Sequence, residues 1–369
     1  MGFDSLRTVQ FRNLADQTVS LHAGDGVARE IFLTGENGQG KTNFLEAVYL
    51  LAYGSSFRTK FDRRLCRHGS TEFSLLATGT FADGATERMV KLQGGEKTIL
   101  VDGNAVVDRR DLLRRLPCIA FTHEDYQFVS GAPEFQRLFF DQSLSLFDVL
   151  YIDNLRRYRK LLRHRNALLG SGGDQRVLEV YERQMALAGL ELMQARRQAV
   201  ELFNPTFTAQ FGEITGLSGD CELKYLPSWK VPEVEAIVGQ LAERRESDRK
   251  LGFTASGPHR DHYRFVHAGR NFAEHASTGQ VRLLSLLLRL VQARLARERT
   301  GQKPVLLIDD VLLELDAVKR QQILNRLPEY DQAYFTFLPD EHLQPLEPLG
   351  PLYLRVDAGQ YIRYGALHG

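Results

Sequence analysis

Cysteine is scarce in this sequence, and no stretch of it is apolar enough to cross a membrane. The three cysteines, Cys66, Cys118 and Cys221, form no C-x-x-C or other metal-binding spacing. A disulfide framework is therefore excluded, and a reducing, cytoplasmic compartment is predicted. Nowhere does an apolar run approach the roughly 20 residues of a membrane helix. Charged residues from Asp4 onward argue against a secretory signal.

The chain also lacks an excess of positive or negative charge. The 47 Lys and Arg residues nearly balance the 46 Asp and Glu residues, which leaves a net charge of +1. The whole chain is therefore not a basic nucleic-acid binder, although its net charge hides a local basic run. Apolar residues make up 43% and charged residues 25%, which excludes a disordered chain. A length of 369 residues predicts two or three structural units.

The two ends of the chain and its middle differ in pattern. Up to about residue 125, short apolar runs alternate with Gly, Asp and Asn, which is typical of strands and turns. Residues 133–215 are nearly free of glycine apart from 170–173, and they predict a helical hairpin bent at that point. The run 304–308, Pro-Val-Leu-Leu-Ile, suits a buried parallel strand. We therefore expect an α/β domain with a helical insertion.

A phosphate-binding loop is the most specific motif. Residues 35–42 read Gly-Glu-Asn-Gly-Gln-Gly-Lys-Thr and fit G-x-x-x-x-G-K-[ST], between an apolar strand and a helical run. Glycines let the backbone turn its N–H groups toward phosphate, and the helix N-terminus adds its positive dipole end. Lys41 is predicted to reach the β and γ phosphates of ATP, and Thr42 to ligate Mg²⁺. The predicted nucleotide-binding residues of the loop are Gly35, Glu36, Asn37, Gly38, Gln39, Gly40, Lys41 and Thr42.

A pair of acids follows the apolar strand that ends at residue 308. Asp309 is the predicted second Mg²⁺ ligand, and Asp310 is predicted to orient or deprotonate the attacking water. With Lys41 they form the predicted catalytic set. A turn or helix cap after the strand is the alternative for both acids. Their distance from the loop predicts a head whose two halves come from opposite ends of the chain.

One stretch of the helical middle is strongly basic. Residues 156–165 contain six Lys or Arg and no acid. On a helix, Arg156, Lys160 and Arg163 share a face, with Arg159 adjacent, and that face is opposite much of an apolar stripe. Unneutralised repulsion favours a polyanionic partner, so we predict contact with DNA at Arg156, Arg159, Lys160 and Arg163. A solvated helix face is the alternative.

Further motifs resemble those of ABC-type ATPase heads. Ser277-Thr-Gly279-Gln280, just before a strong helix, resembles the ABC signature that grips the γ-phosphate bound to a partner subunit. A plain helix cap is the alternative. Glu314-Leu-Asp316 is similar to the D-loop. The resemblance implies an α/β fold: an ABC-type ATPase head with a P-loop core built from both ends of the chain and a helical second lobe.

Further motifs extend the resemblance over essentially the whole length of the chain. They are Phe11-Arg-Asn-Leu14, 35–47, Ser56-Phe-Arg58, Phe121 to Asp125, Phe139-Phe-Asp141, Tyr158 with Leu161, Arg165 and Asn166, Gly257-Pro-His-Arg-Asp261, and 306–316. Together these motifs resemble those of the RecF family of bacterial recombination mediators. The resemblance implies three segments: the N-terminal part of the ATPase lobe at 1–125, a helical lobe with a short hairpin arm at 126–250, and the C-terminal part of the ATPase lobe at 251–369. It also implies nucleotide contacts at Arg12, Ser277, Gly279, Gln280 and Asp316.

The same resemblance implies the function. Such a protein is a weak, DNA-stimulated ATPase of DNA repair, recombination and replication-fork maintenance, active in DNA damage and the SOS response. ATP and Mg²⁺ would drive a homodimer onto double-stranded DNA near single-strand gaps or single-strand/duplex junctions. RecR and, indirectly, the recombinase and the single-strand-binding protein are the implied partners. Thr336 stands where ABC transporters have a switch histidine, which implies slow hydrolysis.

The chain departs from the family pattern in one segment, and other functions are still open. The family usually carries adjacent arginines where this chain has Gln136-Arg137-Leu138, so we expect an altered DNA or partner surface at 134–138. The alternative functions are the ATPase subunit of a membrane transporter or of another partner, an SMC-like structural ATPase, and an ATP-gated scaffold without significant hydrolysis. A transporter subunit would carry Leu-Ser-Gly-Gly-Gln, a Glu in place of Asp310 and a His in place of Thr336.

Overall fold

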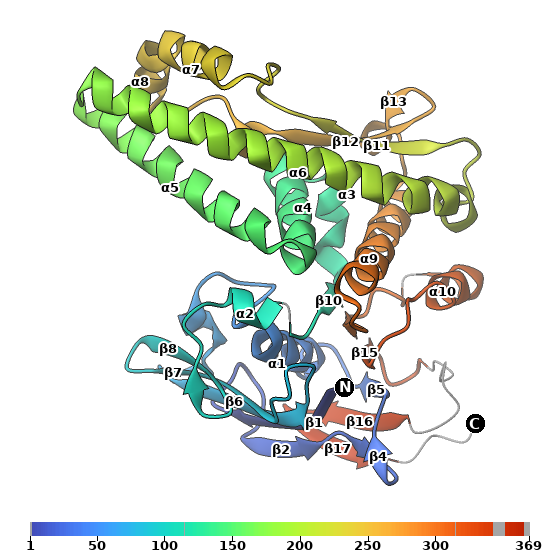
Figure 1. Cartoon of the computed structure of the whole chain (residues 1–369). Coiled ribbons are helices and arrows are strands. Elements are labelled where there is room, and N and C mark those ends of the chain that lie inside the picture. Colours follow the sequence, from blue (N-terminus) through green and yellow to red (C-terminus); the bar gives the residue numbers. More distant parts are fainter. Residues whose placement is uncertain (1, 114, 314, 342–350, 365–369) are drawn as a thin grey trace. The chain divides into compact units, whose positions relative to one another are not determined.

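The computed structural model describes residues 2–113, 115–313, 315–341 and 351–364 (Figure 1). They form two compact units, each described here by itself. The first unit comprises Met1–Glu124 and Ala293–Gly369, and the second comprises Asp125–Gln292. Residues 251–292 therefore lie in the helical unit, and the expected assignment of this stretch to the ATPase lobe is corrected. Sheet pairing explains the shift, because β12 (His262–His267) pairs along its whole length with β11 (Cys221–Leu226).

The core of the first unit is a sheet that both ends of the chain build. Its order is β10-β14-β15-β5-β16-β17, with all neighbours parallel except the last pair. The central strand β5 comes from the N-terminal end, and its Phe32 ring stacks between those of Phe335 and Tyr353. The predicted two-ended head is thus confirmed. The strands are β5 (Glu30–Thr34), β10 (Cys118–Phe121), β14 (Val305–Ile308), β15 (Gln332–Phe337), β16 (Leu352–Asp357) and β17 (Gln360–Tyr364).

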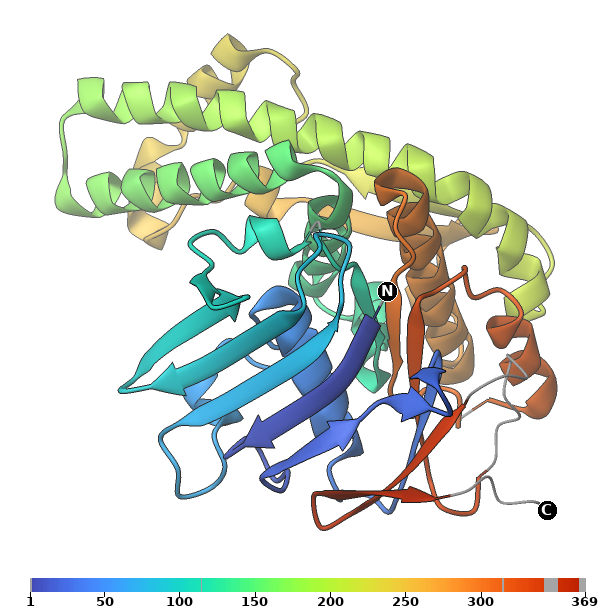
Figure 2. The same cartoon turned by 60° about the horizontal axis from the view of Figure 1, so that its bottom comes forward.

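A second, antiparallel sheet belongs to the same unit, and Figure 2 shows its strands side by side. Helix α1 (Lys41–Tyr53) contacts strands of both sheets, so nearly all its residues are buried and it is apolar around most of its circumference. The antiparallel sheet has the order β2-β1-β6-β7-β8-β9. Its strands are β1 (Gly2–Val9), β2 (Gln17–Ser20), β6 (Phe73–Thr80), β7 (Glu87–Gln93), β8 (Glu96–Val101) and β9 (Asn104–Ala105).

Short elements complete the first unit. Two small strands pair with each other, and three short helices of four to eight residues connect the longer elements. These elements are β3 (His22–Ala23), β4 (Gly26–Val27), η1 (Asp62–Leu65), α2 (Arg110–Leu113) and α10 (Ala317–Leu324). None of the described helices of the chain is long and apolar enough to span a membrane.

The second unit is built on a helical hairpin. Helices α5 (Val149–Ser171) and α6 (Gln175–Thr215) lie side by side and turn at Gly172, whose φ of 67° ends α5 in the left-handed region (Figure 1). The predicted hairpin and its bend are confirmed. The other elements are η2 (His123–Tyr126), which begins in the first unit, α3 (Gln127–Ser130), α4 (Pro133–Phe147), α7 (Val234–Glu243), α8 (Arg245–Leu251), η3 (Pro258–Arg260), β13 (Arg270–Asn271), η4 (Phe272–Glu274) and α9 (Thr278–Thr300), which continues into the first unit.

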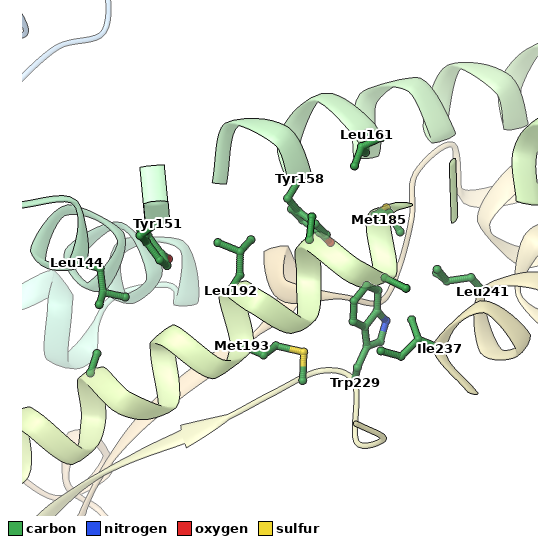
Figure 3. Close-up of a cluster of buried hydrophobic side chains, with 13 residues drawn as sticks. Leu144, Tyr151, Tyr158, Leu161, Met185, Leu192, Met193, Trp229, Ile237 and Leu241 are labelled. Carbon is green, nitrogen blue, oxygen red and sulfur yellow. The ribbon is translucent and has the colours of Figure 1, made fainter. Parts of the chain in front are cut away.

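The apolar stripe of α5 forms the core of this unit. Tyr158 and Leu161 pack with Trp229 and with residues of α6 and α7 (Figure 3). Trp229 is the only tryptophan of the sequence and is fully buried. Gly257 lies against this cluster with φ of 128°, and a Cβ there would come within 2.5 Å of the Tyr158 hydroxyl. Close approach and left-handed backbone together require glycine.

Two buried arginines tie the motifs of the second unit together. Arg196 on α6 donates to Asp141 and Asp261 at 2.8 Å each. Arg165 on α5 bonds Glu182 and Asp248 and is fully buried. Fully hydrogen-bonded ion pairs of this kind are costly to break by removing one partner, about 3–5 kcal/mol. The motifs around Arg165 and Asp261 are thus structural.

The segment 134–138 is only partly exposed. Gln136 is buried, and its amide lies 3.4 Å from both Val129 O and Tyr263 N. Arg137 donates to the main-chain oxygen of Asp261 at 2.8 Å. Among the three residues that depart from the family pattern, Leu138 alone is exposed. The departure therefore changes the interior of the second unit at Gln136 and an exposed position at Leu138, and an altered DNA or partner surface at 134–138 stays a prediction.

Candidate functional site

The phosphate loop joins the C-terminal end of β5 to the N-terminus of α1. Gly40 has φ of 122°, and a Cβ there would lie 2.8 Å from a Leu14 methyl group. At Gly35 a Cβ would lie 2.4 Å from Val356 O. Both positions need glycine, the first for its backbone and the second for space. No side chain of the described residues caps α1, so its first N–H groups are available to an anion.

Lys41 is held over the loop. Its Nζ donates to Gly35 O at 2.7 Å and to Glu36 O at 3.3 Å, and its side chain is only 4% exposed. The carboxylate of Asp310 lies 3.9 Å away. The ammonium group is thus preorganised within the loop, where a phosphate would replace its carbonyl partners. Sequence reasoning placed this residue correctly in the loop, and its role toward phosphate stays a prediction.

The two predicted magnesium ligands are in direct contact. Thr42 Oγ1 donates to Asp309 Oδ1 at 2.8 Å, although the residues are 267 positions apart. Thr336 Oγ1 lies 3.2 Å from the same oxygen and 2.7 Å from Asp310 Oδ1. Burial raises the pKa of Asp309 to about 6; the Thr42 hydrogen bond opposes this rise, and the neighbouring Asp310 adds to it. A hydroxyl and a carboxylate with this spacing fit a hard divalent cation, which would favour the ionised carboxylate.

Asp310 has an unusual backbone. Its φ is 53°, in the left-handed region, and its N–H donates to Thr336 Oγ1 at 2.7 Å. Non-glycine residues with positive φ are uncommon and are found where surrounding contacts enforce them. Here the backbone and the carboxylate both bond the same threonine, which fixes Asp310 beside Lys41.

A buried carboxylate that the sequence analysis missed supports this site. Glu46 on α1 is fully buried and accepts two hydrogen bonds from Arg12 at 2.8 Å each. Ser56 and Arg58 bond the same carboxylate. An acid inside the apolar run of α1 was the available signal, because a buried charge requires a partner. Arg12, a predicted nucleotide contact, is thus anchored to α1 with 20% of its side chain exposed.

Other residues fix the outside of the loop. Asn13 Nδ2 donates to Gly38 O at 2.7 Å, and Asn43 Nδ2 donates to Asn13 Oδ1. Gln39 Oε1 accepts the N–H of Ala358 at 2.5 Å. The turn between β16 and β17 therefore holds the middle of the loop. The remaining predicted loop residues, Glu36, Asn37 and Gly38, have exposed side chains or backbone.

The predicted signature segment begins α9 in the second unit. Ser277 Oγ accepts the N–H of Gln280 at 3.2 Å, and the Gln280 side chain accepts the N–H of Ser277 at 2.8 Å. This reciprocal pair is a capping box, so the helix-cap alternative describes the isolated chain. Ser277 and Gly279 are exposed, and their contact with the γ-phosphate bound to a partner subunit stays a prediction. Asp316 caps α10 by accepting the N–H of Lys319; Glu314 lies outside the described residues.

The basic run on α5 separates into buried and exposed members. Arg165, which was not among the predicted DNA contacts, is part of the buried network. Arg159 pairs with Asp141 at 3.1 Å but is still 60% exposed. The other predicted DNA contacts, Arg156, Lys160 and Arg163, are exposed. The basic residues of α8 differ from those of α5 because an acid partly neutralises them. Arg249 and Lys250 both pair with Glu246.

Comparison with known proteins decides the family. The family described as the RecF/RecN/SMC N-terminal domain matches residues 3–344. The DNA replication and repair protein RecF of Treponema pallidum (strain Nichols) is 39% identical over 340 residues, 91% of this chain and 94% of the relative. The chain belongs to the RecF family of DNA replication and repair proteins. RecF of Alkaliphilus oremlandii is 30% identical over 369 residues, 98% of this chain and all of the relative.

Solved structures agree with the RecF assignment. The recombination mediator protein RecF in the RecFOR pathway, described as RecF-ATP, has a TM-score of 0.87 at 27% identity and covers 98% of this chain and 97% of its own. RecF-ATPrS has a TM-score of 0.85 at 28% identity and covers 99% and 98%. An SMC head bound to the C-terminal winged-helix domain of ScpA has a TM-score of 0.55 at 13% identity and covers 99% and 98%. That likeness confirms the ABC-type head fold.

Proposed function

We propose that this RecF-family protein binds ATP and Mg²⁺ at its phosphate loop and dimerises in response. The dimer would bind double-stranded DNA near single-strand gaps or junctions and help to load the recombinase. One observation carries the proposal: the Thr42 hydroxyl meets the Asp309 carboxylate at 2.8 Å. That contact brings the loop from one end of the chain to the acids from the other, as a Mg·ATP site requires.

The donor set supports ATP and Mg²⁺ as the cofactors. Mg²⁺ prefers oxygen ligands and usually keeps several waters, with one or two protein ligands and phosphate oxygens. Thr42 and Asp309 provide a hydroxyl and a carboxylate, and Lys41 provides the charge for the phosphates. The similar solved RecF structure is described as RecF-ATP. When bound, Mg²⁺ would neutralise charge on the β and γ phosphates.

We infer a dimer because the phosphate loop of one chain would contact only one side of the nucleotide. In an ABC-type head the phosphate loop contacts one side of the nucleotide, and the signature of a second subunit contacts the γ-phosphate. Ser277 and Gly279 are exposed and Gln280 is half-buried at the N-terminus of α9, where a helix dipole favours negative charge. ADP lacks the γ-phosphate, so it would not hold the dimer. The difference would come from a few charge-assisted hydrogen bonds, each worth about 1.5–3 kcal/mol.

Slow, DNA-stimulated hydrolysis would reset the dimer. Asp310 is the proposed residue that orients or deprotonates water. Thr336 already exchanges hydrogen bonds with the Asp310 N–H and carboxylate, so its hydroxyl is occupied. Thr336 stands where ABC transporters have a histidine that contacts the γ-phosphate. Because threonine has no imidazole to make that contact, we expect ATP hydrolysis to be slow. The same observation supports a second candidate, an ATP-gated scaffold without significant hydrolysis, which a turnover assay separates.

DNA and protein partners complete the proposal. The exposed bases of α5 would contact phosphates, because each such contact releases counterions from duplex DNA. The solved relative is described within the RecFOR pathway, which supports RecR as a direct partner and the recombinase and single-strand-binding protein as indirect ones. A cytoplasmic location fits these partners.

One titration tests the proposed function. The mass of the protein and its affinity for gapped duplex DNA are measured with ATP, ADP and no nucleotide, each with Mg²⁺. We expect dimers and tight DNA binding with ATP alone. Equal mass and equal DNA affinity in the three conditions would refute the ATP-dependent clamp.

A further inference from the structure

A phenylalanine lies on the surface of the second unit, just after α8. Phe253 is 40% exposed, although phenylalanine is among the residues most often buried in proteins. The guanidinium carbon of Arg260 lies 4.7 Å from the centroid of its ring. Arg260 is exposed as well. Phe253 and Arg260 therefore form a stacked pair, called here the platform, that solvent can reach.

The backbone on both sides of Phe253 is fixed by hydrogen bonds. Gly252 ends α8 in the left-handed region with φ of 78°, and its N–H donates to Asp248 O at 2.9 Å. The N–H of Thr254 donates to Asn166 Oδ1 on α5 at 3.0 Å. Asp248 and Thr254 are both fully buried. The exposed ring between them is therefore carried by a rigid segment, which lowers the entropy cost of binding a ligand there.

The segment that carries the platform adjoins the basic face of α5. Helix α8 packs against α5 (Figure 1), and Asn166, which bonds Thr254, follows Arg163 by three residues. Residues with this spacing are neighbours on a helix surface. At 1.5 Å per residue, α5 advances about 15 Å from Arg156 to Asn166, the length of about four base pairs of duplex DNA. A duplex that follows the exposed bases of α5 would therefore end near Phe253.

The stretch 249–264, which the structure describes in full, exposes positive charge alone. Its single acid, Asp261, is fully buried. Arg260 and Arg264 are exposed, and the exposed Arg249 and Lys250 of the same stretch share the carboxylate of Glu246. An anionic ligand at the platform would thus meet no acid of this stretch, and the excess positive charge favours such a ligand.

We propose that Phe253 and Arg260 stack on the first unpaired base where duplex DNA meets a single strand. This inference rests on the proposed function and names the part of gapped DNA that the second unit contacts. Aromatic rings stack on any base, because every base has a π-face, and arginine adds a cation–π contribution. The bases of a continuous duplex are already stacked on both sides and offer no free face. The platform therefore distinguishes a junction from a duplex, while the exposed bases of α5 contact the phosphates of both.

The ratio of two DNA affinities tests the platform. Binding of the full chain with Mg·ATP is measured for a continuous duplex and for a gapped duplex of the same length. We expect Phe253→Ala to weaken binding of the gapped DNA by about fivefold or more, with no change for the continuous duplex, and Phe253→Trp to keep the preference. Phe61→Ala is the matched control, because Phe61 is 64% exposed and the guanidinium carbon of Arg64 lies 5.0 Å from its ring centroid. A wild-type chain with no preference for gapped DNA would overturn the proposed function and the platform together. A wild-type preference that persists in Phe253→Ala would overturn the platform alone.

A second measurement needs no substitution in the protein. The base 5-iodouracil, which crosslinks on irradiation to an aromatic side chain stacked on it, is placed either at the first unpaired position of the gap or inside the duplex. The crosslinked residue of the wild-type chain is identified by mass spectrometry. We expect a crosslink to Phe253 from the unpaired position and none from the duplex position. Crosslinks from the unpaired base to other residues only, or equal crosslinking of Phe253 from both positions, would contradict the stacking.

Discussion

The Thr42 hydroxyl donates a 2.8 Å hydrogen bond to Asp309 across 267 positions of sequence. Strand order explains the contact, because β5 and β14 flank β15 in one parallel sheet. The carboxyl ends of parallel strands meet at one edge. The loop after β5 and the acids after β14 must therefore come together, along with Thr336 near the end of β15.

Lys41 should be essential for tight ATP binding. In Lys41→Ala the phosphates lose the flexible counter-charge held within the loop. Loss of charge-assisted hydrogen bonds worth about 1.5–3 kcal/mol weakens binding roughly 10- to 150-fold. Equilibrium binding of a fluorescent ATP analogue measures the effect. Lys60→Ala, an exposed lysine of the same unit, is the control, and undiminished affinity in Lys41→Ala would contradict the assignment of the loop.

Asp310 should separate ATP binding from hydrolysis. Asp310→Asn keeps the side-chain size and one oxygen for Thr336, so we expect ATP to stay bound. Without the carboxylate that orients water, turnover should fall by about 100-fold or more, and the ATP dimer should live longer. Single-turnover hydrolysis and dimer lifetime are measured together. Asp310→Glu, which keeps a carboxylate, should retain part of the activity; equal turnover in Asp310→Asn and wild type would exclude the role.

The exposed bases of α5 should determine how DNA affinity depends on salt. Lys160→Glu/Arg163→Glu should weaken binding of duplex DNA while the ATP dimer still forms. Each lost phosphate contact should flatten the plot of log affinity against log salt by about 0.9. Arg249→Glu/Lys250→Glu is the control, because both residues already pair with Glu246. A slope that matches wild type would place the DNA elsewhere.

His259 should make the second unit less stable in acid. Its Nε2 must donate to Thr254 O, so its Nδ1 accepts from the Tyr158 hydroxyl. Burial lowers the pKa of His259 from 6.5 to about 4. Between these values the unfolded chain binds a proton that the folded chain does not. The free energy of unfolding therefore falls as pH falls, by up to about 1.4 kcal/mol per pH unit.

Trp229 fluorescence measures this effect, because the only tryptophan lies in the core of the same unit. Urea unfolding at pH 7.5 and pH 5 is compared for wild type and His259→Gln. The wild type should lose more stability between the two pH values than the variant does. Equal losses would show that His259 does not titrate as stated.

Local signals were enough to predict the nucleotide side of the molecule. The loop, the strand before Asp309 and the hairpin at 170–173 each follow from spacing and composition within a short window. Long-range pairing was not predictable in this way. The burial of Arg165 could not be read from the basic run at 156–165, because its partners Glu182 and Asp248 come from other helices.

The boundary between the two units was missed for the same reason. Strand β12 pairs with β11 across the intervening helices α7, α8 and η3, and no local pattern reveals that pairing. Glu46 is the site residue that physical reasoning could have found, because a carboxylate inside an apolar helix requires buried partners. Its partners Arg12 and Arg58 could not be assigned without the fold.

The central claim is that ATP completes its site across two copies of the chain. The most direct test is the mass of Ser277→Arg with Mg·ATP, measured alongside its binding of gapped duplex DNA and of ATP. The account predicts a chain that binds ATP as tightly as wild type but stays monomeric and no longer binds DNA in response to ATP. A Ser277→Arg protein that dimerises with ATP and binds DNA normally would contradict it and leave 277–280 as a helix cap alone.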